Sequence, residues 1–149
     1  MSPETLFWIA HLPALVGWIV LLAAPLIGPS SIGIARAAAA VLAIGYLLIF
    51  LFAPEGLGAL ATDYSLRSVG SLFADPRLLL LGWVHYLAFD LWVASWEADE
   101  GRRLGISHAW VAPAMFLTFM LGPLGLLTFL LVRALHGRRG RVKRAGQVY

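Results

Sequence analysis

Four long runs of the sequence contain almost no charged residue, and this feature limits the fold more than any other. The hydrocarbon core of a bilayer is about 30 Å thick, and about 20 apolar residues are needed to cross it as a helix. The runs cover residues 6–26, 37–53, 78–96 and 109–135. Backbone groups inside a bilayer have to pair within their own segment, so each run is expected to be helical. The sequence therefore predicts an all-α integral membrane protein with a four-helix bundle.

The composition agrees with this class. The chain has 149 residues, of which 60% are hydrophobic and 13% charged, an apolar share above that of ordinary soluble domains. Little sequence is left outside the runs, so residues 1–149 are expected to form a single membrane domain. Most of the positive charge lies in a basic tail, residues 136–149, which is typical of a membrane-flanking segment rather than of a nucleic-acid partner.

The segments between the runs predict an orientation. Lys and Arg are more frequent in the 54–77 connection and in the tail than in the other two connections, so four crossings would place both termini in the cytoplasm. The expected location is a bacterial inner membrane, with no transit peptide. The 54–77 connection is long and half apolar, which favours an interfacial or re-entrant segment.

The third run carries the polar residues on which chemistry would depend. At about 100° per residue, Tyr86, Asp90 and Glu97 share one stripe, and His85, Phe89, Trp92 and Trp96 share the adjoining one. An Asp at the centre of a membrane helix costs about 2.5–3.5 kcal/mol on insertion scales, so Asp90 should face other helices or a wet cavity. A structural alternative remains open, in which Asp90 is protonated and bonds another helix while His85 is a neutral interhelical donor.

The neighbouring segments offer weaker candidates. Glu97, Asp99 and His108 combine carboxylate and imidazole, which suit Zn, Mn or Fe, but their spacing matches no metal signature and a solvated turn is the alternative. In the fourth run, Met115, Phe119 and Gly122 project near one line. The stretch from Gly122 to Gly125 includes a proline, and this kinked notch suits either close helix packing or a bend around an elongated ligand.

Several uncommon sequence motifs follow one another in the C-terminal half, over residues 82–133. Together they resemble the family of abscisic-acid-deficient-four-like membrane proteins. The N-terminal half agrees with that family only in hydropathy. The motifs are Trp83-x-His85-Tyr-Leu-Ala-Phe-Asp90, Trp96-Glu-x-Asp99, Arg103-x-Gly105-Ile-Ser-His108, and Leu117-Thr-Phe-Met-Leu-Gly-Pro-Leu-Gly-Leu-Leu127.

The resemblance implies a membrane protein that acts on a xanthophyll whose epoxide opens to an allene, an isomerisation associated in plants with neoxanthin synthesis. Such a reaction needs an acid and a base but no required cofactor. We expect Asp90, with His85 or Tyr86 as its partner, to be catalytic. Trp92, Phe89, Phe119, Gly122 and Met115 are the expected ligand-binding residues.

Two other classes of protein stay open from the sequence. One is a non-catalytic carotenoid- or lipid-binding scaffold, which would use the same aromatic stripe without needing the acid of Asp90. The other is a haem- or metal-bearing membrane redox protein, with His85 or His108 as a ligand beside His11. Membrane lipids and a carotenoid are the expected partners, and a homo-oligomer is left open.

Overall fold

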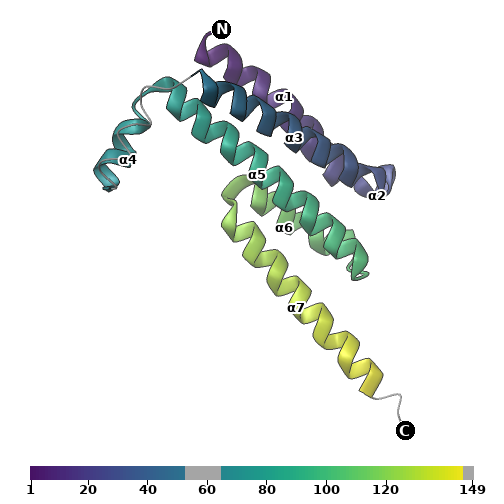
Figure 1. The fold of residues 1–149 in the computed structure, drawn as a ribbon. Helices are drawn as coiled ribbons and strands as arrows, with labels where there is room; N and C mark the ends of the chain where they lie inside the picture. Colours follow the sequence, from purple (N-terminus) through teal and green to yellow (C-terminus); the bar gives the residue numbers. More distant parts are fainter. Residues whose placement is uncertain (53–64, 146–149) are drawn as a thin grey trace.

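Three helices in this structure, a computed structural model, are long and apolar enough to cross a membrane. The structure describes residues 1–52 and 65–145, with side chains up to His136. In chain order the helices are α1 (Pro3–Leu22), α2 (Ala24–Ile27), α3 (Ser30–Leu51), α4 (Leu66–Leu72), α5 (Pro76–Arg103), α6 (His108–Leu121) and α7 (Pro123–Ala145). The long helices α1, α3 and α5 lie side by side (Figure 1). The predicted all-α class is confirmed for the described residues.

The ends of the long helices follow from local chemistry. Between α1 and α3, Gly28 takes a φ of +81°, a left-handed value that favours glycine, and Pro29 follows it. The N-terminus of α5 is capped by Asp75, whose carboxylate accepts hydrogen bonds from the backbone N–H groups of Arg77 and Leu78. Helix α1 ends at Leu22, so the first predicted run, 6–26, also includes part of α2, and α3 begins before its predicted start at residue 37.

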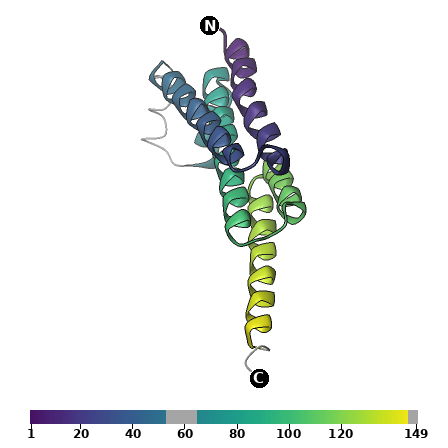
Figure 2. The ribbon, with the colours of Figure 1, turned by 90° about the vertical axis from the view of Figure 1, so that its right-hand side faces the viewer.

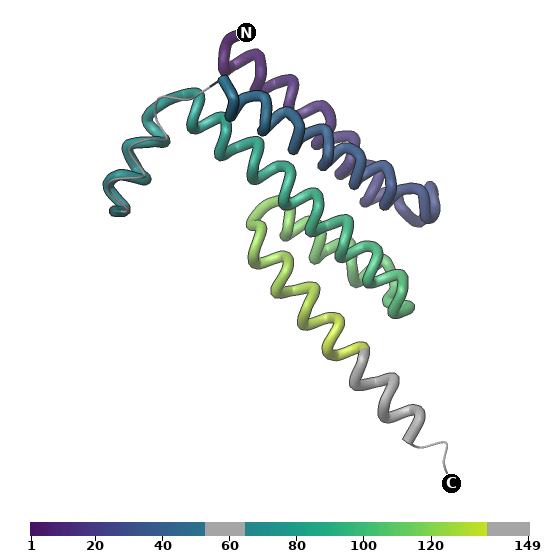
Figure 3. The backbone as a smooth tube through the Cα atoms, in the orientation of Figure 1, coloured from purple at the N-terminus to yellow at the C-terminus, as the bar shows by residue number. Residues whose placement is uncertain are grey.

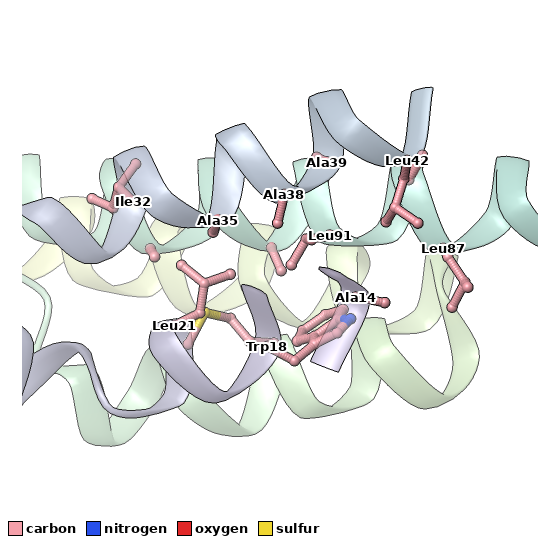
Figure 4. Close-up of a cluster of buried hydrophobic side chains, with 14 of the residues drawn as sticks. Ala14, Trp18, Leu21, Ile32, Ala35, Ala38, Ala39, Leu42, Leu87 and Leu91 are labelled. Atoms are coloured by element: carbon pink, nitrogen blue, oxygen red, sulfur yellow. The ribbon is translucent and has the colours of Figure 1, made fainter. Parts of the chain in front are cut away.

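Small and branched apolar side chains form the core between α1, α3 and α5 (Figure 4). Ala35 and Leu91 are completely buried, and a side chain at Gly17 would collide with Leu91. Small residues let membrane helices approach closely, and dispersion then stabilises the contact. Many outward-facing residues of the same helices are apolar as well, as expected where lipid surrounds them.

The predicted single helix over residues 109–135 is wrong, because these residues form two helices. Gly122 has a φ of +48°, and Pro123 begins a new helix. The chain reverses there, so α6 and α7 form a helical hairpin (Figure 3). Helix α6 has 14 residues, or about 21 Å, too short to cross a bilayer core of about 30 Å. We expected Pro123 to kink one continuous helix. Instead, the chain reverses its direction at Gly122, and Pro123 is the first residue of the next helix.

Contacts with α5 define the direction of each arm of the hairpin. Along α6, Val111 packs on Gly101 and Thr118 bonds Glu97, so α6 runs antiparallel to α5. Along α7 the order is opposite, since Gly122 lies beside Asp90, the Phe129 ring contacts Trp96, and Arg133 pairs with Glu100. Both arms therefore meet the C-terminal half of α5, and the hairpin turn lies part-way along that helix.

This arrangement removes the basis for placing both termini on one side of the membrane. The start of α1 and the far end of α7 lie at opposite ends of the molecule (Figures 1 and 2), and among the described residues three helices are long and apolar enough to cross a membrane. The interfacial or re-entrant segment expected at 54–77 falls largely on residues 53–64, outside the described residues. Within the described part, Leu66–Leu72 forms the short helix α4.

Candidate functional site

Two polar side chains of α5 meet the turn of the α6–α7 hairpin. The hydroxyl of Tyr86 donates a hydrogen bond of 2.7 Å to the carbonyl of Phe119, in the last turn of α6. One helical turn further along α5, Asp90 lies against Gly122, where an added Cβ would be 3.3 Å from Asp90 Oδ1. Carbonyls at a helix C-terminus lack intrahelical partners, so Tyr86 satisfies one of them. The turn and the two side chains form what we call the turn site.

Asp90 supplies the carboxyl of the turn site. Its side chain is half-buried, and its Oδ2 atom is buried with no hydrogen-bond partner among the described residues. The carboxyl also lies close enough to Tyr86 to interact with it electrostatically. An oxygen without a partner in a low-dielectric region is costly to leave unpaired and is available to a ligand or a proton. Asp90 can therefore exchange a proton with a bound molecule.

Glu97 is a second buried acid on the same stripe of α5, where the sequence suggested a weak metal ligand or a residue of a solvated turn. Its exposed fraction is 0%, and Oε1 accepts a hydrogen bond of 2.9 Å from the Thr118 hydroxyl on α6. Its Oε2 has no partner among the described residues. The stripe shared with Asp90 was the available signal for its burial. The hairpin covers Glu97 and turns it into an internal group.

We expect Thr118→Val to destabilise the protein, because it leaves the buried Glu97 carboxyl without its donor. The loss should be about 1–3 kcal/mol, the usual cost of an unsatisfied buried polar group. Thr128→Val is the matched control, since the Thr128 hydroxyl bonds only its own helix, at Leu124. Thermal unfolding in detergent micelles measures both. If Thr118→Val melts at the same temperature as Thr128→Val, the Glu97 contact does not hold the hairpin.

The structure places His85 away from Asp90 and Tyr86, on the outer side of α5. Its ring stacks on Phe89 with centroids 4.5 Å apart and lies 5.8 Å from the ring of Tyr46 on α3. Phe89 and Trp92 on the same stripe are 59% and 51% exposed. The two stripes read from the sequence are therefore two separate surfaces, and the three residues expected to be catalytic do not converge.

The five residues expected to bind a ligand are divided in the same way. Phe119 and Gly122 belong to the turn site, whereas Phe89 and Trp92 lie on the outer surface with His85. Met115 is completely buried, where it packs in the core rather than lining an opening. Only the first two of these residues can contact a molecule that also reaches Asp90.

The three weak metal candidates have separate partners. Glu97 bonds Thr118, Asp99 pairs with Arg36 at 2.9 Å and with Arg102 at 3.3 Å, and His108 Nε2 lies 3.2 Å from the carbonyl of Leu22. Among the described residues, no group of three or more His, Asp or Glu side chains is placed to hold a metal ion. The described residues thus offer no ready donor set for a metal centre.

An aromatic cluster extends from the turn site to α1. The rings of Trp83 and Tyr86 have centroids 5.6 Å apart, and Trp83 Nε1 donates a hydrogen bond of 3.3 Å to His11 Nε2. His11 Nδ1 lies 2.7 Å from the carbonyl of Phe7, which fixes the proton on Nδ1. Trp83 therefore links His11 to Tyr86 through two contacts. A lone histidine in the first run was the only signal for it.

A separate apolar groove of about 680 Å³ lies between α1, α3 and the start of α5. Ala10, Pro13, Leu42 and Val84 are among its lining residues. None of the ligand-binding residues expected from the sequence lines this groove.

Comparison with known proteins gives one result that bears on identity. A family model described as ABA DEFICIENT 4-like matches residues 5–129, most of the chain. No curated protein and no solved structure matches the chain.

Proposed function

Because the chain belongs to the ABA DEFICIENT 4-like family, we propose that it acts on a carotenoid within the membrane, as an isomerase that converts a xanthophyll epoxide into an allene. The observation that carries this proposal is Asp90, an acid with an unpaired oxygen beside Tyr86 at a turn inside the bilayer. A carboxyl inside a membrane costs free energy, so its presence there indicates a functional role.

The proposed reaction needs two proton transfers and no change in oxidation state. Asp90 gives its proton to the epoxide oxygen, and the electron pair of the breaking C–O bond stays on that oxygen, which becomes a hydroxyl. A proton then leaves the adjacent polyene carbon, and its C–H electrons form the new double bond of the allene. The Asp90 carboxylate left by the first step takes this proton, so the site returns to its starting state, while the Tyr86 hydroxyl holds the hairpin turn beside the acid. Positioned acid–base groups of this kind typically contribute about 10²–10⁴-fold to a rate.

The surroundings of the turn site suit an apolar polyene. Such a molecule dissolves in the hydrocarbon core, and the hairpin turn lies part-way along α5 rather than at its end. Trp83, which contacts Tyr86, is 39% exposed, so an aromatic face is available beside the acid. Aromatic and apolar contacts with a few placed polar groups are typical of ligand sites. The end ring of a xanthophyll would therefore lie against Trp83 and Phe119, with its oxygen towards Asp90.

The test is product analysis with purified protein in liposomes that contain an epoxy-xanthophyll. We expect an allenic isomer of unchanged mass, resolved by chromatography and identified by its absorption and NMR spectra. Tyr86→Phe should slow formation of this isomer, because the hydroxyl that holds the hairpin turn beside Asp90 is lost. Pigment that binds stoichiometrically but is recovered unchanged would instead establish a non-catalytic scaffold.

We also propose an orientation in which α1 begins outside the cytoplasm. With three crossings, the connection between α3 and α5 carries Arg67 and Arg77, and every other Lys or Arg belongs to the opposite end. Positive residues gather on the cytoplasmic side of membrane proteins. This orientation is the reverse of the one predicted from four crossings. The residues of the opposite end are Arg36, Arg102, Arg103, Arg133, Arg138, Arg139, Arg141, Lys143 and Arg144.

Cysteine labelling tests this orientation cleanly, because the chain contains no cysteine. Ala74 and Ser107 are exposed and lie beyond the two ends of α5, so Ala74→Cys and Ser107→Cys form a matched pair. In intact cells a membrane-impermeant maleimide should label Cys at position 74 and should reach position 107 only after permeabilisation. Four crossings with cytoplasmic termini give the opposite pattern.

A further inference from the structure

The apolar groove of about 680 Å³ between α1, α3 and the start of α5 opens towards lipid. Its inner wall is made of buried residues, among them Leu42, Leu80 and Val84, and its two edges carry the exposed side chains of Leu12 on α1 and Leu48 on α3. Both edges belong to helices that are long and apolar enough to cross the membrane. A hydrocarbon chain can therefore enter the groove sideways from the bilayer.

The length of the groove matches one leaflet of the bilayer. Its lining residues extend from Pro3 to Pro13 along α1 and from Val41 to Phe52 along α3, which is about 15–17 Å at 1.5 Å per residue. The hydrocarbon core of a bilayer is about 30 Å thick, so one leaflet is about 15 Å deep. The groove thus begins where α1 begins, at one membrane surface, and ends near the midplane, as a single acyl chain does.

A cation lies at the surface end of the groove. Among the described residues that line it, Arg77 has the only charged side chain, and this residue is in the first turn of α5. Arg77 is exposed, and its guanidinium makes no ion pair with the part of the chain that the structure describes. The nearest acid along α5, Asp75, accepts hydrogen bonds from the backbone N–H groups of the helix. The guanidinium is therefore available to an anion, and its planar donors suit a phosphate.

From the length, the lining and the charge of this groove we infer that it binds an anionic phospholipid, with one acyl chain between α1 and α3 and the phosphate against Arg77. A xanthophyll is a poorer occupant, because it brings no anion to Arg77. A zwitterionic phospholipid brings a second cation beside it. None of the residues that line the groove belongs to the turn site, so this is a second site with a different ligand.

The experiment compares two phospholipids that share their chains and differ in net charge. The full chain, stripped of lipid in detergent, is exchanged against dioleoyl phosphatidylglycerol or dioleoyl phosphatidylcholine, and native mass spectrometry counts the lipids retained. Wild type should retain one phosphatidylglycerol in preference to phosphatidylcholine. Gly45→Trp should lose both lipids, because Gly45 lines the groove and a Cβ added there meets nothing within 4 Å. Gly33→Trp, on an exposed part of the same helix outside the groove, is the matched control and should retain the lipid.

Arg77→Gln tests the charge and leaves the groove open. It should lower the preference for phosphatidylglycerol about fivefold, the usual effect of one cation at an anionic membrane surface. Arg103→Gln, the same change at the other end of α5, should leave the preference unchanged. Circular dichroism checks that each variant is folded, and if Gly45→Trp does not fold, Arg77→Gln decides the question.

Three results would overturn the proposal. The first is a wild type that retains both phospholipids equally, or that retains xanthophyll and no phospholipid. The second is an Arg77→Gln variant with the preference of wild type. The third is a folded Gly45→Trp variant that retains as much lipid as Gly33→Trp, which would place the lipid outside the groove.

Discussion

Asp90→Asn should abolish product formation while the protein remains folded. The amide keeps the size of the carboxyl and its place against Gly122, but it cannot give a proton to an oxygen or take one from a carbon. We expect the rate to fall by at least about 10²-fold, the lower end of what a positioned acid or base contributes. The measurement is the initial rate of isomer formation in liposomes, alongside thermal unfolding of the same sample.

Two comparisons make that result specific. Asp99→Asn is the same change on the same helix, at a carboxylate that pairs with Arg36 and Arg102 away from the hairpin turn, and it should keep activity. His85→Ala should also keep activity, because His85 points to the outer face. Full activity of the Asp90→Asn variant would contradict the proposed role of Asp90 in proton transfer. A loss in His85→Ala as large as that in Asp90→Asn would mean that the outer face takes part in catalysis.

Gly125→Ala should produce the largest loss of stability among Gly→Ala changes at the glycines whose surroundings the structure describes. A Cβ at Gly125 would overlap the backbone nitrogen and the side-chain oxygen of Thr118, so the two arms of the hairpin would have to separate. Overpacking a close contact costs typically about 1–3 kcal/mol, and here the obstacle is rigid backbone rather than the end of a flexible side chain. Separation would also weaken the Thr118 bond to Glu97. Thermal unfolding should show a clearly lower midpoint.

Gly45→Ala is the control for this prediction. Gly45 also lies inside a helix, but an added Cβ there meets nothing within 4 Å. Alanine is a better helix former than glycine by about 0.5–1 kcal/mol, so this variant should be neutral or slightly stabilised. Equal unfolding midpoints for Gly125→Ala and Gly45→Ala would show that the arms of the hairpin are not closely packed.

The residues of the turn site show what helical periodicity can predict from a sequence and what it cannot. Spacing alone put Tyr86, Asp90 and Glu97 on one stripe of a membrane helix, and this grouping needs only the period of about 3.6 residues. It also put His85, Phe89 and Trp92 on the adjoining stripe. Periodicity cannot say which neighbour each stripe meets, because that depends on helices distant in sequence. Pairing His85 with Asp90 from nearness in the sequence therefore joined two surfaces that the fold keeps apart.

The sequence by itself determined that this chain is a helical membrane protein. Its long apolar runs contain almost no charge, and in lipid a helix satisfies the backbone hydrogen bonds within each run. Only the tertiary structure decided that the fourth apolar run is a hairpin. Gly122 and Pro123 are compatible with a kink or a reversal, and the reversal is stabilised by contacts that span the chain, such as those of Tyr86 with Phe119 and Glu97 with Thr118. Those contacts also cover Glu97, place Asp90 at a turn, and separate the two ends of the protein.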